Sequence, residues 1–187
     1  MIIKLNKKDL EAVEAFVNER MKNVGLYRRR GGINRNHLIS GAYGEIAAYK
    51  LLKKAGIQVT KPDFTIHSKK SYDADLCGDF YFHVKSQPHY QVPKYTKSWA
   101  MQKEDPILKV PMPDHHLILC VANVDTGEVE IVGCPSVSQM VDQDLFGNMK
   151  LKGLQSNKVA IYYNQLEEEL NKKDLWGPLY VQYRTKA

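Results

Sequence analysis

Apolar residues recur at helical spacing in two segments near the start of the chain. In residues 7–23 they lie three or four positions apart, and Asn6 precedes them as a candidate N-cap. A second helix is predicted from about Asn36, another candidate N-cap, to Ala55, with Gly56 as its C-terminal stop. Both segments are expected to be amphipathic helices that bury one face.

Shorter apolar runs follow, and their length and flanking turn residues predict β-strands. The expected strands cover residues 57–60, 64–67, 72–76, 80–86, 115–124, 128–133 and 159–163. Cys77, Gly78 and Asp79 form a hairpin-sized turn after the third of these. Residues 87–113 contain five prolines and are expected to be a long irregular loop.

The last third of the chain mixes both kinds of pattern. A helix is predicted over about residues 136–146, and a capping box at residues 164–167 predicts a short second helix. Alternating apolar residues in 175–184 predict a final edge strand. The order of elements predicts an α/β (α+β) fold around one central sheet. We expect a single domain, 1–187, with an N-terminal helix at 7–23 and a C-terminal extension at about 150–187.

Positive charge is concentrated in one part of the chain. The 187 residues carry a net charge of +6, from 27 Lys and Arg against 21 Asp and Glu. Residues 20–54 alone carry +8, so the rest of the chain sums to −2, and Glu45 is the single acid in that window. A local basic field of this kind indicates a polyanionic partner, nucleic acid before membrane.

Simple counts argue against several classes of protein. No run approaches the about 18 apolar residues of a membrane span, since the longest, residues 117–124, is strand-sized. The first residues lack the apolar core and cleavage site of a signal peptide. The three cysteines have no CxxC spacing, which argues against a disulfide scaffold or zinc ribbon and favours a cytoplasmic location.

Glu45 stands out within the second predicted helix, where it lies at the border of the apolar stripe. Gly41 and Gly44 beside it cost about 1 kcal/mol of helix stability each against Ala. Small residues at these positions would let another backbone approach closely. A glutamate on the rim of the stripe, paired with Lys53 or Arg35, is the alternative interpretation.

A second group of polar residues lies on the predicted hairpin. Asp73 and Asp75 are two residues apart, so on a strand both carboxylates point to one face. His83, Lys85 and Gln87 alternate in the same way on the next strand. A turn with an odd number of residues would place the aspartates on the face of His83 and Lys85, whereas a bulge would shift the pairing. A solvated strand face is the alternative interpretation of the aspartate pair.

This set of side chains suits phosphodiester hydrolysis. Carboxylate oxygens are ligands that Mg²⁺ prefers, and the ion lowers the pKa of a bound water. A lysine beside such an ion can position that water and stabilise the charge that builds on the phosphate.

The order of these residues resembles the PD-(D/E)XK nuclease superfamily. A helical Glu45 is followed by Asp73 or Asp75 on a strand and by His-Val-Lys at residues 83–85 on the next strand. The resemblance covers about residues 38–134 and implies a restriction-endonuclease-like fold, a central mixed β-sheet flanked by helices. In that superfamily the helical Glu, the Asp and the acid two residues before the Lys bind a divalent metal. The Lys, here Lys85, assists the attacking water.

Two departures from the superfamily pattern bear on the site. Tyr72 replaces the proline before the aspartate, and His83 occupies the position of the acid. Asp75 could supply the missing carboxylate with Asp73 in the usual role, or the reverse. Because imidazole suits Mn²⁺ better than Mg²⁺, we expect Mn²⁺ to support activity at least as well. His83 either tunes the site or marks the loss of activity.

Two further segments are candidates for nucleic-acid contact. Residues 27–32 hold three arginines and two glycines directly before the second helix, a composition typical of phosphate contact by a loop. Residues 87–99 interleave lysines with aromatic residues, which suits phosphate contact and stacking on unpaired bases. Solvated loops are the alternative in both cases. The predicted nucleic-acid-binding residues are Arg28, Arg29, Arg30, Arg35, Lys94 and Lys97.

The leading hypothesis is a metal-dependent DNA endonuclease, with Mg²⁺ or Mn²⁺ as cofactor. Its predicted catalytic residues are Lys85, Glu45, Asp75, Asp73 and Gln87, where Gln87 orients Lys85 or a phosphate. Its predicted metal ligands are Glu45, Asp73, Asp75 and His83. We expect a homodimer, since cutting two strands needs two sites, and no membrane partner. The alternative is a non-catalytic nucleic-acid-binding protein on a degenerate nuclease fold, and the sequence does not separate DNA from RNA.

Overall fold

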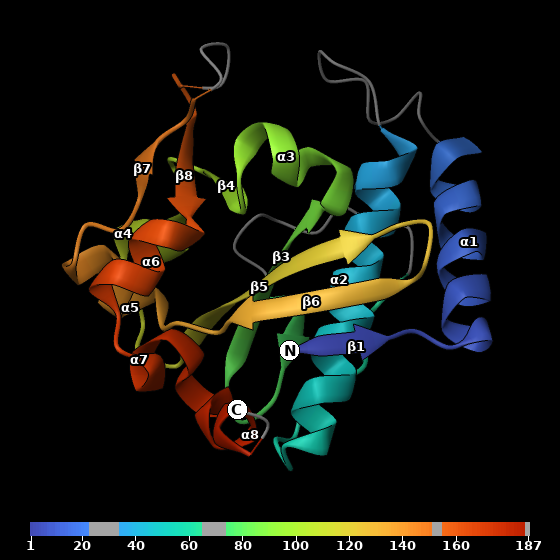
Figure 1. Cartoon of the computed structure of the whole chain (residues 1–187), viewed down its shortest axis with the longest axis horizontal. Helices are drawn as coiled ribbons and strands as arrows, with labels where there is room; N and C mark the ends of the chain where they lie inside the picture. Colours follow the sequence, from blue (N-terminus) through green and yellow to red (C-terminus); the bar gives the residue numbers. More distant parts are fainter. Residues whose placement is uncertain (23–33, 65–73, 151–154, 186–187) are drawn as a thin grey trace.

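Two β-sheets and their flanking helices make a mixed α/β fold (Figure 1). The computed structural model describes residues 1–22, 34–64, 74–150 and 155–185. The elements in chain order are β1 (Ile2–Lys4), α1 (Lys7–Lys22), α2 (Arg35–Lys54), β2 (Leu76–Cys77), β3 (Tyr81–Pro88), η2 (His89–Gln91), α3 (Val92–Tyr95), β4 (Ser98–Gln102), α4 (Pro106–Lys109), β5 (His115–Asn123), β6 (Glu128–Gly133), α5 (Val137–Asp142), β7 (Gly147–Asn148), β8 (Lys158–Tyr162), α6 (Tyr163–Glu169), α7 (Lys172–Trp176), η4 (Gly177–Leu179) and α8 (Tyr180–Arg184).

The larger sheet has five strands in the order β1-β6-β5-β3-β2. β3 and β5 run parallel, with Lys85 opposite Leu119, and the other neighbours are antiparallel. Parallel neighbours cannot be joined by a tight turn, so residues 89–114 must cross over between them. The prediction of a mixed sheet flanked by helices is confirmed at this level.

A second, three-stranded sheet has the order β4-β8-β7. The prediction of one central sheet is therefore wrong, and so is the prediction of an irregular loop over residues 87–113. That segment contains η2, α3, β4 and α4, and β4 pairs with β8 from Ser98 opposite Tyr162 to Gln102 opposite Lys158. These elements are three to five residues long, too short to give a periodic pattern in the sequence.

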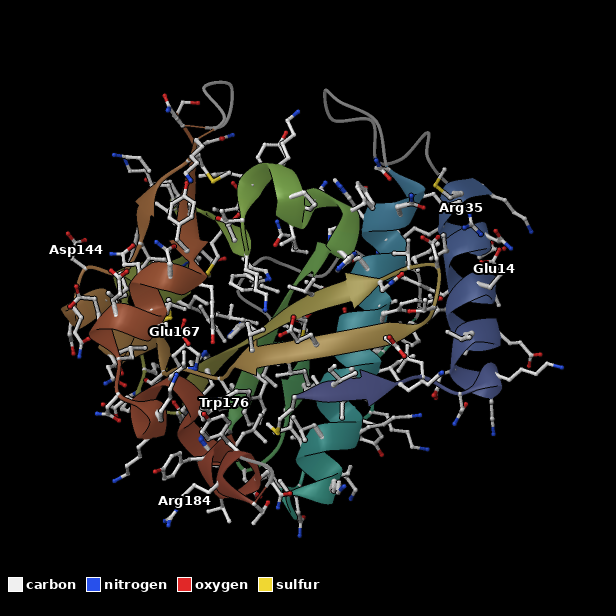
Figure 2. All side chains as sticks on the ribbon, in the orientation of Figure 1. Glu14, Arg35, Asp144, Glu167, Trp176 and Arg184 are labelled. Carbon is white, nitrogen blue, oxygen red and sulfur yellow. The ribbon has the colours of Figure 1, made fainter. Side chains whose placement is uncertain are left out.

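Helices α1 and α2 pack together on the outside of the larger sheet (Figure 1). The predicted N-terminal helix is confirmed, since α1 begins after Asn6, whose side chain accepts from the Asp9 backbone N–H at 3.0 Å. The N-cap of α2 is Asn34 rather than the predicted Asn36. An ion pair between Glu14 of α1 and Arg35 of α2 joins the two helices (Figure 2).

The core lies between α2 and the sheet. Ala47, Ala48, Leu51 and Leu52 of α2 are fully buried and belong to one hydrophobic cluster with the apolar residues of β5 and β6. Within the described residues, no helix is long and apolar enough to cross a membrane.

The predicted edge strand at 175–184 is wrong, because this segment forms α7, η4 and α8. Trp176 and Tyr183 stack with ring centroids 4.8 Å apart. Three other predictions also differ. Residues 57–60 contribute only a bridge from Val59 to Gly78, α5 is shorter than predicted, and α6 begins at Tyr163 without a side-chain cap. Residues 65–67 and 72–73 of two predicted strands lie outside the described residues.

Candidate active site

Strand β3 presents different side chains to its two faces. The Ser86 hydroxyl lies 2.9 Å from the Ser40 hydroxyl of α2, so Ser86 faces that helix. Gly44 of α2 comes so close that an added Cβ would lie 3.2 Å from Val84 Cγ1 and 2.9 Å from Ser86 Cβ. Because side chains alternate along a strand, His83, Lys85 and Gln87 project to the other face.

The Asp75 carboxylate is hydrogen-bonded to the backbone of β3. β2 pairs with β3 only at Leu76 opposite Phe82 and Cys77 opposite Tyr81, which leaves a turn of three residues. Immediately before this pair, Oδ2 of Asp75 accepts a hydrogen bond of 2.7 Å from the Val84 backbone N–H. The odd turn is the arrangement that places Asp75 on the same face as His83 and Lys85. Asp73 lies outside the described residues.

Glu45 directly follows the close contact of Gly44 with β3. The Glu45 side chain is half-buried, and its Oε2 atom is shielded from solvent. The close approach expected from the small residues is real at Gly44, whereas an added Cβ at Gly41 would meet nothing within 4 Å. The helix that carries Glu45 thus packs on the face of β3 that holds Val84 and Ser86, whereas Asp75 and Lys85 lie on the other face.

His83 is a buried, neutral side chain with a specific partner. Its exposed fraction is 1%, and its Nε2 lies 3.0 Å from Nδ1 of His115. Burial lowers the pKa of His83 to about 3, and the Lys85 and His115 charges act in the same direction. In this arrangement Nε2 is already engaged, so the imidazole is not presented as a free metal ligand. Sequence reasoning missed His115, because only the parallel pairing of β3 with β5 brings it to His83.

Gln87 holds a neighbouring segment of chain. Its side-chain N–H donates to the Thr96 carbonyl at 2.9 Å, and its carbonyl oxygen accepts from the Ser98 backbone N–H at 3.1 Å. With an exposed fraction of 4%, the amide is nearly buried. These contacts fix residues 96–98 against β3 and leave the amide oriented toward that segment.

Asp105 is a second acidic residue near Lys85 that the sequence reasoning missed. It is 2% exposed, and its Oδ1 accepts from the Ile107 N–H at 3.3 Å as the N-cap of α4. Burial raises the pKa of its carboxyl, while the Ile107 hydrogen bond and the Lys85 charge lower that pKa. The Asp-Pro dipeptide at 105–106 is a helix-start signal that could have identified it.

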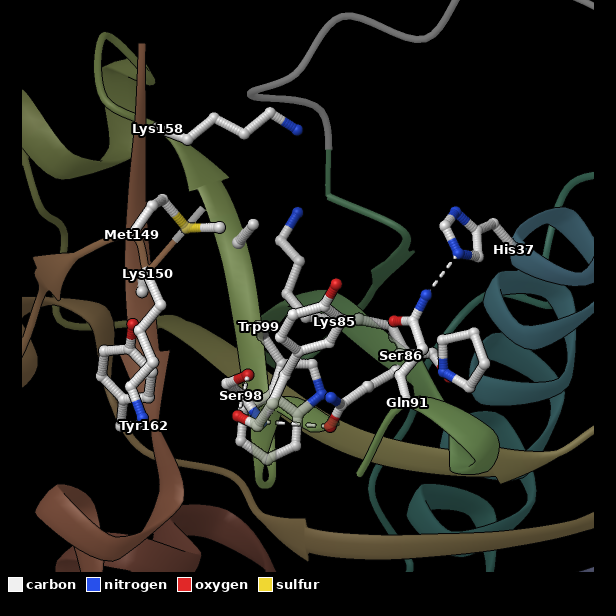
Figure 3. Close-up of a pocket in the computed structure, with 16 residues that line it drawn as sticks. His37, Lys85, Ser86, Gln91, Ser98, Trp99, Met149, Lys150, Lys158 and Tyr162 are labelled. Carbon is white, nitrogen blue, oxygen red and sulfur yellow. Dashed lines mark hydrogen bonds between the residues drawn. The ribbon is translucent and has the colours of Figure 1, made fainter. Parts of the chain in front are cut away.

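A pocket opens at the free edge of β3, beside the second sheet. Its volume is about 450 Å³, and Lys85, Lys150 and Lys158 line it from three parts of the chain (Figure 3). Tyr95 and Tyr162 also line it. No Asp or Glu is among the described lining residues, so the pocket favours an anionic ligand.

The predicted nucleic-acid contacts differ in their placement. Arg28, Arg29 and Arg30 lie outside the described residues. Arg35 pairs with Glu14, and the Lys97 ammonium lies 2.8 Å from a Glu130 carboxylate oxygen. Lys94 is exposed on α3, with its ammonium 5.1 Å from the centre of the Tyr95 ring.

The described residues do not form a closed metal site. No three of their His, Cys, Asp and Glu side chains are grouped so that they could hold an ion. Of the predicted ligands, Asp75 accepts the Val84 N–H through its carboxylate, whereas Glu45 lies on α2, which packs on the face of β3 that holds Val84 and Ser86. Mg²⁺ is commonly bound through one or two carboxylates and several waters, so the Asp75 carboxylate fits a largely hydrated ion rather than one enclosed by protein.

Comparison with known proteins identifies no family for this chain. No protein-family model matches the chain, and no curated protein and no solved structure matches it.

Proposed function

We propose that the protein is a divalent-metal-dependent endonuclease of the PD-(D/E)XK type that hydrolyses DNA phosphodiester bonds. The observation that carries the proposal is the position of Lys85, which lines a lysine-rich pocket one residue after the N–H that binds the Asp75 carboxylate. The mixed sheet flanked by helices supports a restriction-endonuclease-like fold. Two copies would be needed to cut both strands, so we include a homodimer in the proposal.

In this proposal the lysines bind the phosphate and position the attacking water. The Lys85 ammonium would hold a water against the scissile phosphate and stabilise the negative charge that develops on its oxygens. Lys150 and Lys158 would hold the phosphate backbone from the other side of the pocket. Glu45 and Asp75, with Asp73, would hold Mg²⁺ or Mn²⁺, which when bound lowers the pKa of water and neutralises phosphate charge. The hydrogen bond from Val84 keeps the Asp75 carboxylate in a fixed orientation.

Plasmid cleavage tests this proposal. Supercoiled, linear, single-stranded and branched DNA are incubated with Mg²⁺, with Mn²⁺ or with EDTA. We expect metal-dependent nicking that Lys85→Ala reduces by at least about 100-fold. Lys172→Ala is the matched control. The Lys172 ammonium lies 3.2 Å from a Glu167 carboxylate oxygen, and Lys172 does not line the pocket. Nicking that survives in Lys85→Ala would contradict the proposal.

One observation favours the alternative of a nucleic-acid-binding protein without catalysis. His83 stands where the superfamily has an acid, and it pairs with His115 inside the protein. A site that has lost this acid would retain the lysine-rich pocket and bind nucleic acid. Metal-independent binding with no cleavage of any of the four DNA forms is the result that this alternative predicts.

A further inference from the structure

The lysine-rich pocket combines cations with aromatic rings in a repeated arrangement. The Lys150 ammonium lies 5.0 Å from the centre of the Tyr162 ring, and the Lys94 ammonium lies 5.1 Å from that of Tyr95. Tyr95 and Tyr162 both line the pocket, one from α3 and the other from β8. Two rings, each with its own lysine, therefore border one cavity.

The rings and cations belong to a fixed framework. The Tyr162 hydroxyl donates to the Asn148 carbonyl at 2.9 Å, which ties β8 to β7. Gln87 fixes residues 96–98 to β3, and the indole N–H of Trp99, another lining residue, donates to the Cys120 carbonyl at 2.8 Å. A pocket held in this way needs little rearrangement to bind a ligand, which lowers the entropic cost of binding.

The size and chemistry of the pocket select a class of ligand. A volume of about 450 Å³ falls in the range of about 300–1,000 Å³ that is usual for small-ligand sites, and it is far too small for a duplex. The lysines favour a phosphate, and an aromatic ring can stack on any base whose face is exposed. A base in a duplex has both faces covered by its neighbours, so it must leave the stack to reach such a ring.

We infer that this pocket binds one unpaired nucleotide of a DNA strand, with its phosphate on Lys85 and Lys158 and its base against Tyr95 or Tyr162. Figure 3 shows the Lys85 and Lys158 side chains extending into the pocket from two sides. When a base stacks on Tyr162, the Lys150 ammonium moves from the ring to a phosphate, and base stacking is the stronger of the two ring contacts. This inference names the substrate class of the proposed nuclease, single-stranded or branched DNA, but the binding itself does not depend on cleavage.

Fluorescence anisotropy in EDTA, where no metal-dependent cleavage occurs, tests the inference separately from the nuclease proposal. The probe is a fluorescein-labelled oligothymidylate, and the competitors are unlabelled oligothymidylate, a closed duplex with hairpin ends and oligouridylate. We expect the single strand of DNA to compete at least about tenfold better than the duplex of equal phosphate content. Equal competition by the duplex would overturn the inference, and better competition by oligouridylate would reassign the pocket to RNA.

Substitutions then locate the binding. Tyr95→Ala and Tyr162→Ala should each weaken binding by about fivefold or more, whereas Tyr95→Phe and Tyr162→Phe should retain it, because stacking needs the ring and not the hydroxyl. Tyr90→Ala is the matched control, since Tyr90 is 49% exposed and does not line the pocket. Lys158→Ala should lower the slope of log affinity against log salt by about 0.7, while Lys172→Ala should not change the slope.

Two results would place the nucleotide elsewhere. One is unchanged binding in both Tyr→Ala variants, with their folding verified by circular dichroism. The other is equal loss of binding in Tyr→Phe and Tyr→Ala, which would show that the hydroxyls act and the rings do not. Binding without cleavage by the wild type would contradict the nuclease proposal but not this inference. Cleavage that prefers duplex DNA would contradict this inference but not the nuclease proposal.

Discussion

Asp75 and Val84 are joined by a hydrogen bond of 2.7 Å, in which a carboxylate oxygen accepts a backbone N–H of β3. The ladder between β2 and β3 spans only two residue pairs and ends next to Asp75. The carboxylate thus replaces the carbonyl that a longer β2 would supply. One side chain therefore satisfies a backbone donor at the free edge of β3 and lies beside Lys85.

Removing this acceptor should destabilise the protein. Asp75→Ala leaves the Val84 N–H without its acceptor, at an expected cost of about 1–3 kcal/mol in the free energy of unfolding. Asp75→Asn keeps an oxygen in the same position and should cost less, although it removes the charge needed for activity. Urea denaturation of both variants measures the difference, and equal stabilities would show that the hydrogen bond contributes nothing.

The contact of α2 with β3 should not tolerate a larger residue. Gly44→Ala puts a Cβ 2.9 Å from Ser86 Cβ, so we expect a loss of about 1–3 kcal/mol in unfolding free energy. Gly41→Ala, three residues earlier on the same helix, meets nothing within 4 Å and should stabilise by up to about 1 kcal/mol. Thermal unfolding compares the two, and effects of the same sign would contradict the packing described here.

The buried His83 should make stability depend on pH. An ordinary histidine in the unfolded chain binds a proton near pH 6.5, while the pKa of His83 in the folded protein is lowered to about 3. Between these values the unfolded state binds more protons, so the free energy of unfolding falls as the pH falls. The expected contribution is about 1.4 kcal/mol per pH unit below pH 6.5.

Urea denaturation of the wild type and of His83→Gln between pH 4 and pH 7, a range that spans the titration of histidine in the unfolded chain, measures this slope. We expect the variant to be less stable at pH 7 but to have a shallower dependence on pH. His89→Gln, at an exposed position, is the control. Parallel curves for the wild type and His83→Gln would refute the assignment of this pH dependence to His83.

Lys97 should contribute little to DNA binding, although its sequence context predicts a contact. Its ammonium lies 2.8 Å from Glu130 and 5.4 Å from the centre of the Tyr163 ring. Lys97→Ala should therefore leave affinity for DNA within about twofold, whereas Lys158→Ala in the pocket should weaken it. Filter binding at two salt concentrations decides between them, and a larger loss from Lys97→Ala would restore the sequence-based assignment.

The two long helices and the hairpin at the candidate site could be predicted because their signals are local. The helical period and Asn6 identify α1, and the hairpin turn predicted at residues 77–79 lies one residue before the observed turn at 78–80. The order of Glu45, Asp75 and Lys85 along the chain also requires no long-range information. Glu45 and Lys85 lie on α2 and β3, whose patterns extend over enough positions to be recognised.

The second sheet and the pocket could not be predicted in the same way. β4 and β8 are about 60 residues apart in the sequence, and their pairing depends on packing that no local pattern encodes. Lys150 and Lys158 meet Lys85 only through that pairing. The helices at the end of the chain were predictable, since Trp176, Tyr180 and Tyr183 follow helical spacing, but the alternation of apolar residues in the same segment favoured a strand.

The crossover between β3 and β5 has a consequence for the order of folding. Residues 89–114 form a wall of the pocket, and Gln87 attaches residues 96–98 of that wall to β3 through two side-chain hydrogen bonds. Pairings distant in sequence form slowly, so β3 and β5 pair only after this long segment has returned across the sheet. The Ser98 amide, whose acceptor is the Gln87 side chain, should therefore exchange with solvent faster than the amide of Leu119 in the buried β3–β5 ladder.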